Sequence, residues 1–271
     1  MNLLPTHYQL ALEAAIAASK EIMRIYENDF ETIIKEDGSP LTVADLASSS
    51  IIQGFLEKTE IPITGEETEK SDFVNRAEWS ECWCVDPLDG TKEFISRNGE
   101  FAVNIALIRD GKPIFGIITA PVEQQFILGS KEIGVFIAHF DDVHVPSKWR
   151  KIESTEKMND PIVMVGSRSH KGGEMNQLLH KIEEISPNYE SLCKGSSLKF
   201  FDLAEGRVDV YPRFAPTMEW DIASGQAILE ALGGKVLDSN TEEPLTYNKS
   251  NLLNPYFIAY TKAAFQKLCV D

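Results

Sequence analysis

A short stretch of the chain, WCVDPLDGTKEF at residues 83–94, carries the side chains best suited to chemistry. Its apolar start predicts a buried strand, which we expect to stop at Pro87 because proline cannot continue a sheet ladder. The carboxylates of Asp86 and Asp89 would then stand at the end of the strand. The glycine that follows allows a tight turn, and Thr91 can begin a helix whose free N–H groups face the carboxylates.

This arrangement predicts metal-assisted phosphoryl chemistry. Carboxylates bind hard cations such as Mg²⁺, and a helix N-terminus binds phosphate. Two neighbouring carboxylates resist ionising together unless a cation offsets their repulsion. Taken alone, the motif is equally compatible with a solvated acidic turn. Its spacing does not match a calcium-binding EF-hand loop, in which the acids alternate before the glycine.

The composition is typical of a soluble globular protein with a sizeable core. The 271 residues are 43% hydrophobic and 25% charged. A formal net charge of −16 argues against a nucleic-acid polymer as partner, because phosphate backbones require patches of Lys and Arg. It permits a small anionic ligand. The sequence does not indicate whether the protein is a monomer or an oligomer.

We expect a cytoplasmic location, with peripheral association with the inner membrane face left open. No run is long and apolar enough to cross a membrane, and charged residues interrupt the apolar residues near the N-terminus, which argues against a signal peptide. The four cysteines form no C-x-x-C pair. They are expected to be reduced core or near-core residues.

Hydrophobic periodicity predicts the elements that must hold the acidic side chains in place. Residues 6–26 have apolar side chains at helical spacing, and residues 33–38 are expected to form a short strand and a turn. A second helix should begin after Thr42, where Asp45 completes a capping box. Capping is therefore one possible role of Asp45.

Short apolar runs then alternate with turn residues. Residues 61–64 predict a short strand, after which Thr64 and Glu67 match another capping box. The Asp-Gly pair at residues 110–111 is typical of a β-hairpin. The antiparallel strands expected in this half are residues 102–109, 113–120, 125–129 and 134–139.

The polar, irregular segment 146–161 is where we place a boundary. It would separate an N-terminal α+β subdomain, residues 1–150, from a C-terminal α/β subdomain, residues 151–271. Strands and helices alternate in the second part, which predicts a mixed sheet covered by helices. The expected strands are residues 162–165, 208–211, 235–237 and 256–260, and the expected helices are residues 175–185, 198–204, 219–232 and 263–268.

Four separate segments together resemble the inositol monophosphatase-like family of magnesium-dependent, lithium-sensitive phosphatases. They are TVAD at 42–45, GEE at 65–67, DPLDGT at 86–91 and WDIASG at 220–225. The resemblance extends over nearly the whole chain. It implies a layered αβαβα sandwich, the sugar-phosphatase fold also found in fructose 1,6-bisphosphatases, with the site in the cleft between two subdomains.

The family pattern implies two, and at most three, Mg²⁺ ions. Glu66, Asp86 and the backbone carbonyl of Leu88 resemble the ligands of the first ion. Asp86, Asp89 and Asp221 resemble those of the second, so that Asp86 bridges the two.

The same pattern implies how water and phosphate are handled. Thr91 and Asp45 would orient and deprotonate the attacking water, and Glu67 would hold a further water or a third metal. The backbone N–H groups of Gly90 and Thr91 would bind the phosphate that is cleaved.

Three further segments resemble the 3'(2'),5'-bisphosphate nucleotidases within this family. They are SRSH at 167–170, GSSLKF at 195–200, and YPR at 211–213 leading to MEWD at 218–221. The resemblance implies hydrolysis of the 3'-phosphate of adenosine 3',5'-bisphosphate, a reaction of sulfur metabolism. Ser196, Lys199 and Arg213 would meet the second phosphate. His170 would lie near the nucleoside, or be an ordinary polar loop residue.

Two alternatives compete with this hypothesis. The first is another phosphatase of the same fold, such as an inositol monophosphatase, from which the set Ser196, Lys199 and Arg213 distinguishes the chain. The second is a magnesium-binding scaffold without activity, against which the complete set of expected ligands argues.

Overall fold

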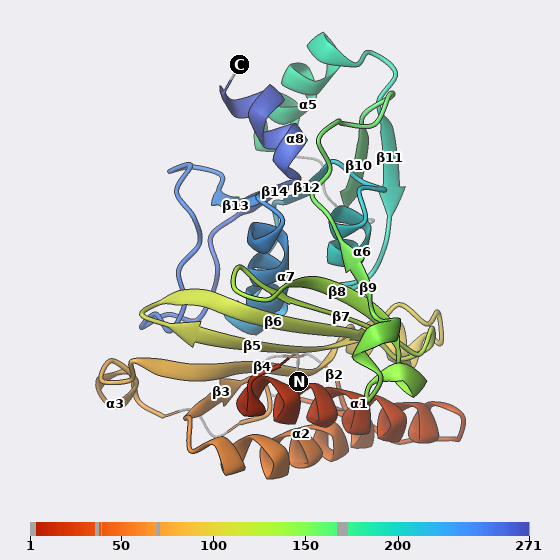
Figure 1. Ribbon diagram of the computed structural model, residues 1–271, viewed down its shortest axis with the longest axis vertical. Helices are drawn as coiled ribbons and strands as arrows, with labels where there is room; N and C mark the ends of the chain where they lie inside the picture. The colour runs from red at the N-terminus through yellow and green to blue at the C-terminus, as the bar shows by residue number, and fades with distance from the viewer. Residues whose placement is uncertain (1–3, 36–37, 39, 69–70, 167–172, 271) are drawn as a thin grey trace.

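The computed structural model describes residues 4–35, 38, 40–68, 71–166 and 173–270. Its elements form five layers, helices alternating with two β-sheets, as Figure 1 shows from bottom to top. The αβαβα arrangement expected from the sequence is therefore confirmed. The acidic stretch lies in strand β4 (Glu81–Asp89) and the helical turn α4 (Thr91–Ile95).

The outer layer at the N-terminal end consists of two long helices. Helix α1 (Thr6–Tyr26) and helix α2 (Val43–Leu56) lie side by side beneath the first sheet. A hairpin of β1 (Thr32–Ile34) and β2 (Pro40–Thr42) connects them. Thr42 is the N-cap of α2, and Asp45 completes the predicted capping box.

The first sheet has seven strands in the order β3-β4-β5-β6-β7-β8-β9. Strands β3 and β4 are parallel, and the other neighbours are antiparallel. One face packs on α1 and α2 through an apolar core that includes Trp83 and Phe115. The strands are β3 (Ile63–Gly65), β4 (Glu81–Asp89), β5 (Ala102–Arg109), β6 (Lys112–Ala120), β7 (Gln125–Ser130), β8 (Gly134–His139) and β9 (Arg150–Ile152).

Helices α6 (Lys199–Ala204) and α7 (Glu219–Ala231) form the middle layer and pack on the other face of this sheet. The backbones approach closely here. A Cβ atom on Gly116 of β6 would lie 2.2 Å from the carbonyl oxygen of Ser224 in α7. Glycine at this position therefore lets α7 lie directly against the strands, with its N-terminus held near the end of β4.

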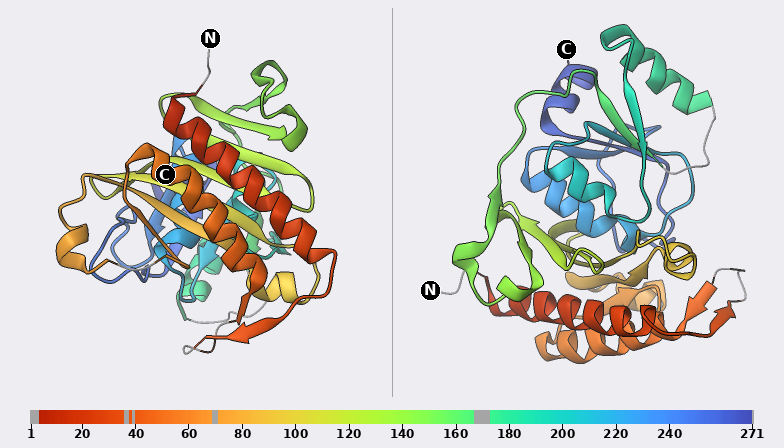
Figure 2. Two further views of the ribbon diagram at one scale, coloured as in Figure 1. Left: turned by 90° about the horizontal axis from the view of Figure 1, so that it is seen from below. Right: turned by 90° about the vertical axis from the view of Figure 1, so that its right-hand side faces the viewer.

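The second sheet lies above this layer and is mixed, as predicted, with the order β11-β10-β12-β14-β13. The outermost layer contains α5 and α8, seen at the top of both views in which the layers are edge-on (Figures 1 and 2). The elements are β10 (Val163–Gly166), α5 (Gly173–Ile185), β11 (Glu190–Cys193), β12 (Val210–Arg213), β13 (Lys235–Asp238), β14 (Phe257–Tyr260) and α8 (Lys262–Phe265).

Short helical turns complete the described chain. They are the α-helical turns α3 (Phe73–Arg76) and α4 (Thr91–Ile95), the 3₁₀ turns Glu57–Thr59, Phe140–Asp142 and Pro146–Lys148, and a π-helical turn Gln266–Val270. No helix among the described residues is long and apolar enough to cross a membrane.

The prediction that the central strand stops at Pro87 is wrong. Strand β4 continues to Asp89, and its pairing with β5 shifts register between Asp86 and Asp89. Pro87 lies within this irregular stretch, where an unpaired residue needs no ladder N–H. The bulge therefore takes the place of the expected strand end.

Three smaller expectations also need correction. The described residues directly after Thr64 form a turn and no helix, so Glu67 does not complete a capping box there and instead ion-pairs with Lys35. Strand β11 was not predicted. Cys82 and Cys84 are buried as expected, whereas Cys193 and Cys269 are exposed, and all four are free thiols.

Candidate active site

The bulge at the C-terminal end of β4 carries two carboxylates, Asp86 and Asp89. Asp86 is buried, and one of its oxygens accepts a hydrogen bond from the Leu88 N–H at 3.0 Å. Asp89 accepts from the backbone N–H of Ser197 at 2.5 Å and from the Asn104 side chain at 3.3 Å. The hydrogen bond from Ser197 connects the end of β4 to the loop that leads into α6.

Helix α7 brings a third carboxylate to the same place. Asp221 is the third residue of the helix, and its side chain turns back to accept from the Met218 N–H at 2.8 Å. This capping contact holds the carboxylate at the helix N-terminus, where the dipole favours negative charge. Asp221 therefore faces the end of β4 from the second half of the chain.

The electrostatics show how close these groups are. Burial, followed by the charges of Glu66, Asp89 and Asp221, raises the pKa of Asp86 well above its usual range. Burial and the charge of Asp89 raise the pKa of Asp221 to about 8. Carboxylates that repel one another in this way form a site that a cation would stabilise.

Glu66 and Glu67 follow β3, and the charge of Glu66 acts on Asp86. Lys35, from the segment after β1, ion-pairs with both carboxylates, at 3.0 Å to Glu66. Burial raises the pKa of Glu66, although the Lys35 ammonium partly opposes that effect. Glycine is required just before Glu66, because a Cβ atom on Gly65 would lie 2.1 Å from the Val85 carbonyl oxygen.

Thr91 and Asp45 form a hydrogen-bonded pair. The Thr91 hydroxyl donates to one oxygen of Asp45 at 3.0 Å, while the other oxygen accepts from the Thr42 hydroxyl and N–H at 2.6 and 2.7 Å. Burial raises the pKa of Asp45. The buried carboxylate of Asp45 therefore caps α2 and binds Thr91 at the same time. Gly90, just before Thr91, has a φ of 93°, a conformation that favours glycine.

A cavity of about 400 Å³ opens beside this cluster. Its lining includes two carboxylates of the cluster, Asp89 and Asp221, and two cations, Lys199 and Arg213. Lys199 is buried, donates to the Ser196 carbonyl at 2.8 Å and lies 5.1 Å from the centre of the Tyr211 ring. Burial and the neighbouring Arg213 charge lower the Lys199 pKa to about 8.

The structure thus brings together residues that are far apart in the sequence. The residues singled out from the sequence that line this cavity are Asp89, Gly90, Ser196, Lys199, Arg213 and Asp221. The buried Asp86 interacts with this group through its charge, and Thr91 with Asp45 lies next to it. His170 lies outside the described residues.

Sequence reasoning missed several polar residues of the site. Lys35 pairs with the two glutamates, and buried Asn104 bonds both Asp89 and Ser197. Glu100 and Lys194 also line the cavity, where Glu100 accepts from the Gly195 N–H at 2.8 Å. Of these residues, only Asn104 could have been found from the sequence, because it is a polar residue within an otherwise apolar strand. The others lie in turns with no periodicity.

The donor chemistry of the cluster suits Mg²⁺, which prefers carboxylate oxygens. Four carboxylates, Glu66, Asp86, Asp89 and Asp221, interact through their charges. As the side chains stand, the described part of the chain has no group of three or more His, Cys, Asp or Glu residues that could hold an ion. All four carboxylates instead accept from N–H donors, which belong to Lys35, Leu88, Ser197 and Met218.

Comparison with known proteins identifies relatives over nearly the full length. The sequence pattern of the inositol monophosphatase family matches residues 4–269. The 3'(2'),5'-bisphosphate nucleotidase CysQ of Shigella flexneri is 38% identical over 251 residues, covering 89% of this chain and 94% of that protein.

Two solved structures are similar to this one. The crystal structure of CysQ from Bacteroides thetaiotaomicron has a TM-score of 0.84 and 39% sequence identity, covering 96% of this chain and 99% of that chain. Inositol monophosphatase-II from Staphylococcus aureus has a TM-score of 0.70 at 20% identity, covering 97% and 90%, and therefore supports the fold alone. The chain belongs to the inositol monophosphatase family.

Proposed function

We propose that this protein is a magnesium-dependent phosphatase that hydrolyses the 3'-phosphate of adenosine 3',5'-bisphosphate to give AMP and phosphate. One observation carries the proposal: two carboxylates of the cluster, Asp89 and Asp221, line the same cavity as two cations, Lys199 and Arg213. Carboxylates that can hold Mg²⁺ and cations that can bind a further phosphate together match a substrate with two phosphates. The name of the CysQ relatives, 3'(2'),5'-bisphosphate nucleotidase, supports the same substrate.

The metal ligands that we propose follow the pattern of the family. Glu66, Asp86 and the Leu88 carbonyl would hold one Mg²⁺, and Asp86, Asp89 and Asp221 a second. Bound there, the ions would supply positive charge for the phosphoryl oxygens and lower the pKa of water. Glu67 is the remaining candidate for a weaker third site.

The chain's own residues supply the proton path. Because the Thr91 hydroxyl donates to Asp45, its oxygen is left to accept a hydrogen bond from the attacking water. As the water oxygen bonds to phosphorus, its proton moves to Thr91 and the Thr91 proton to Asp45. The bond from phosphorus to O3' breaks, and its electron pair stays with O3', which takes up a proton from a solvent water molecule. We propose that the backbone N–H groups of Gly90 and Thr91 bind the phosphoryl oxygens.

Ser196, Lys199 and Arg213 would bind the 5'-phosphate, which does not react. Charge-assisted hydrogen bonds to phosphate, bidentate for arginine, fix a ligand's orientation as well as its affinity. Binding energy from a remote group can orient the reacting one. Phe200 and Ile222, which are buried in the core, also line the cavity. His170, which lies outside the residues that the structure describes, is our candidate for a contact with the nucleoside.

The proposal is tested by phosphate release from three substrates at one magnesium concentration. We expect kcat/KM for adenosine 3',5'-bisphosphate to exceed that for 3'-AMP and for inositol 1-phosphate. The alternative, an inositol monophosphatase of the same fold, predicts that inositol 1-phosphate is the best substrate. A scaffold without activity predicts no release from any of them.

The protonation of Lys199 should make the preference depend on pH. Its pKa of about 8 reflects burial and the Arg213 charge, against which Asp89, Glu93 and Glu100 act. Below that pH the ammonium binds the 5'-phosphate, and above it the neutral amine does not. The ratio of kcat/KM for the bisphosphate to that for 3'-AMP should therefore fall from about pH 7 to about pH 9.5. A ratio that stays constant across this range would contradict the role of Lys199.

Lithium inhibition is a further expectation from the family. Li⁺ would compete for the Mg²⁺ held by Asp86, Asp89 and Asp221. Activity should fall with added lithium chloride and stay higher in sodium chloride at equal ionic strength. Equal responses to the two salts would remove this expectation.

A further inference from the structure

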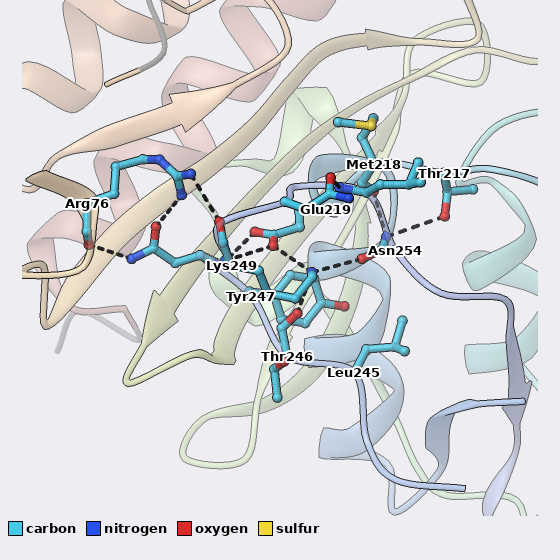
Figure 3. Close-up of polar contacts among 12 residues, drawn as sticks. Arg76, Thr217, Met218, Glu219, Leu245, Thr246, Tyr247, Lys249 and Asn254 are labelled. Carbon is cyan, nitrogen blue, oxygen red and sulfur yellow. Dashed lines mark hydrogen bonds and ion pairs between the residues drawn. The ribbon is translucent and has the colours of Figure 1, made fainter. Parts of the chain in front are cut away.

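An ion pair with a fully buried carboxylate lies two residues before the proposed metal ligand Asp221 in the chain. Glu219, the first residue of α7, is 1% exposed. Its carboxylate accepts from the Lys249 ammonium at 2.6 Å and from the backbone N–H groups of Asn248 and Lys249 at 2.6 and 3.0 Å (Figure 3). The helix start is thereby bonded to a loop almost thirty residues further along the chain.

The same loop holds the two residues that precede the helix. The Asn254 side chain donates to the Met218 carbonyl at 2.7 Å and to the Thr217 hydroxyl at 3.3 Å, and its N–H donates to the Thr217 carbonyl at 2.8 Å. Thr217 lines the cavity, and the Met218 N–H is the group that binds Asp221. The contacts of Asn254 therefore set the position of the donor that orients the Asp221 carboxylate.

Arg76 extends these contacts to the first sheet. It lies in the segment between Glu66 and β4 and is 3% exposed. Its guanidinium donates to the Asn248 side chain at 2.7 Å and to the Lys249 carbonyl at 3.0 Å, and the Asn248 side chain donates back to the Arg76 carbonyl at 2.8 Å. Figure 3 shows the chain of contacts from Arg76 through Lys249 to Met218.

Stability alone is a weak reason for such an arrangement. Removing the Glu219 carboxylate from water costs about as much as its attraction to Lys249 returns, and well-packed apolar side chains often serve as well. What the ion pair supplies is a fixed geometry, because the Glu219 carboxylate has three directed donors. The fixed element is the N-terminus of α7, two residues from Asp221.

We infer that Glu219, Lys249, Asn254 and Arg76 are positioning residues, which hold the start of α7 so that Asp221 is presented to the metal site. This inference deepens the proposed function and rests on it. None of the four side chains lines the cavity, so each acts through the backbone of residues 217–221. Loss of the network should therefore weaken metal binding more than binding of the unreactive phosphate.

Magnesium binding to the full-length, metal-free protein tests the inference, measured by isothermal titration calorimetry. Lys249→Met should raise the Kd for Mg²⁺ about 10-fold, a typical effect of removing a partner that orients a metal ligand. The matched control is Lys131→Met, which breaks an exposed ion pair between Lys131 and Glu230 of the same helix. It should leave the Kd unchanged. Lys249→Arg, which keeps the cation, should restore most of the affinity.

A second variant guards against simple misfolding, since Lys249→Met leaves a buried carboxylate without its cation. The double variant Glu219→Gln with Lys249→Met removes both charges, and it should fold yet still bind Mg²⁺ about 10-fold more weakly. At saturating Mg²⁺, KM for the bisphosphate should match that of wild type. Wild-type Mg²⁺ affinity in both Lys249→Met and the double variant would overturn the inference.

The proposed function fails in a different way. If wild type binds Mg²⁺ but releases no phosphate from adenosine 3',5'-bisphosphate, the substrate assignment is wrong. The comparison of Mg²⁺ affinities between Lys249→Met and Lys131→Met still decides whether the network positions Asp221.

Discussion

Replacing Asp89 by asparagine is expected to lower kcat/KM for adenosine 3',5'-bisphosphate by at least about 100-fold. A bound metal stabilises the transition state by several kcal/mol, and each 1.36 kcal/mol corresponds to about tenfold in rate. Asp89→Asn removes one of the charges that we propose balance two divalent cations. The amide keeps the shape of the side chain and can still accept from the Ser197 N–H, so the fold should be retained.

Steady-state kinetics at saturating Mg²⁺, with circular dichroism of both proteins, measures this effect. The matched control is Asp142→Asn, because Asp142 ion-pairs with Lys148 in a surface turn away from the cavity. Its kcat/KM should stay within about twofold of wild type, since exposed pairs contribute little. Near-normal turnover by Asp89→Asn would contradict the assignment of two metal sites.

Arg213→Ala is expected to reduce the advantage of the bisphosphate over 3'-AMP. Arg213 and Lys199 line the same cavity as Asp89 and Asp221, and we place the 5'-phosphate at these two cations. A hydrogen bond to a charged group contributes about 1.5–3 kcal/mol, which is about 10- to 150-fold in kcat/KM. The bisphosphate should lose this factor, while 3'-AMP, which lacks the 5'-phosphate, should lose almost nothing.

The experiment compares kcat/KM for both substrates in wild type, Arg213→Ala and Arg150→Ala. Arg150 is an exposed arginine on β9 that ion-pairs with Glu205, and it does not line the cavity. Arg150→Ala should therefore change neither value. Equal losses for the two substrates in Arg213→Ala would mean that Arg213 acts on folding or on the reacting phosphate, and the nucleotide assignment would be wrong.

Local patterns were sufficient to predict most elements. Helical spacing predicted α1 with the bounds that the structure has, and the Asp-Gly pair predicted the turn between β5 and β6. The proline in β4 misled the prediction because a bulge, which depends on the pairing with β5, removes the need for its N–H. Whether a strand bends or ends is thus decided by its partner.

The long-range parts of the site could not be predicted from residue patterns. The acidic motif and the Thr42–Asp45 capping box are local, and local sequence carries them. Lys35 meets Glu66 and Glu67 across more than thirty residues, and Lys249 meets Glu219 across thirty. These contacts depend on how β1 and the loop after β13 pack in three dimensions, and no spacing rule connects such pairs.

The central claim is that the 3'-phosphate is cleaved while the 5'-phosphate is held by cations. Phosphorus NMR of adenosine 3',5'-bisphosphate, incubated with the protein and Mg²⁺, tests it most directly because it identifies the product. We predict that the 3'-phosphate signal disappears, that inorganic phosphate appears in equal amount, and that 5'-AMP accumulates. Accumulation of 3'-AMP, or an unchanged spectrum under conditions in which inositol 1-phosphate is hydrolysed, would contradict the account.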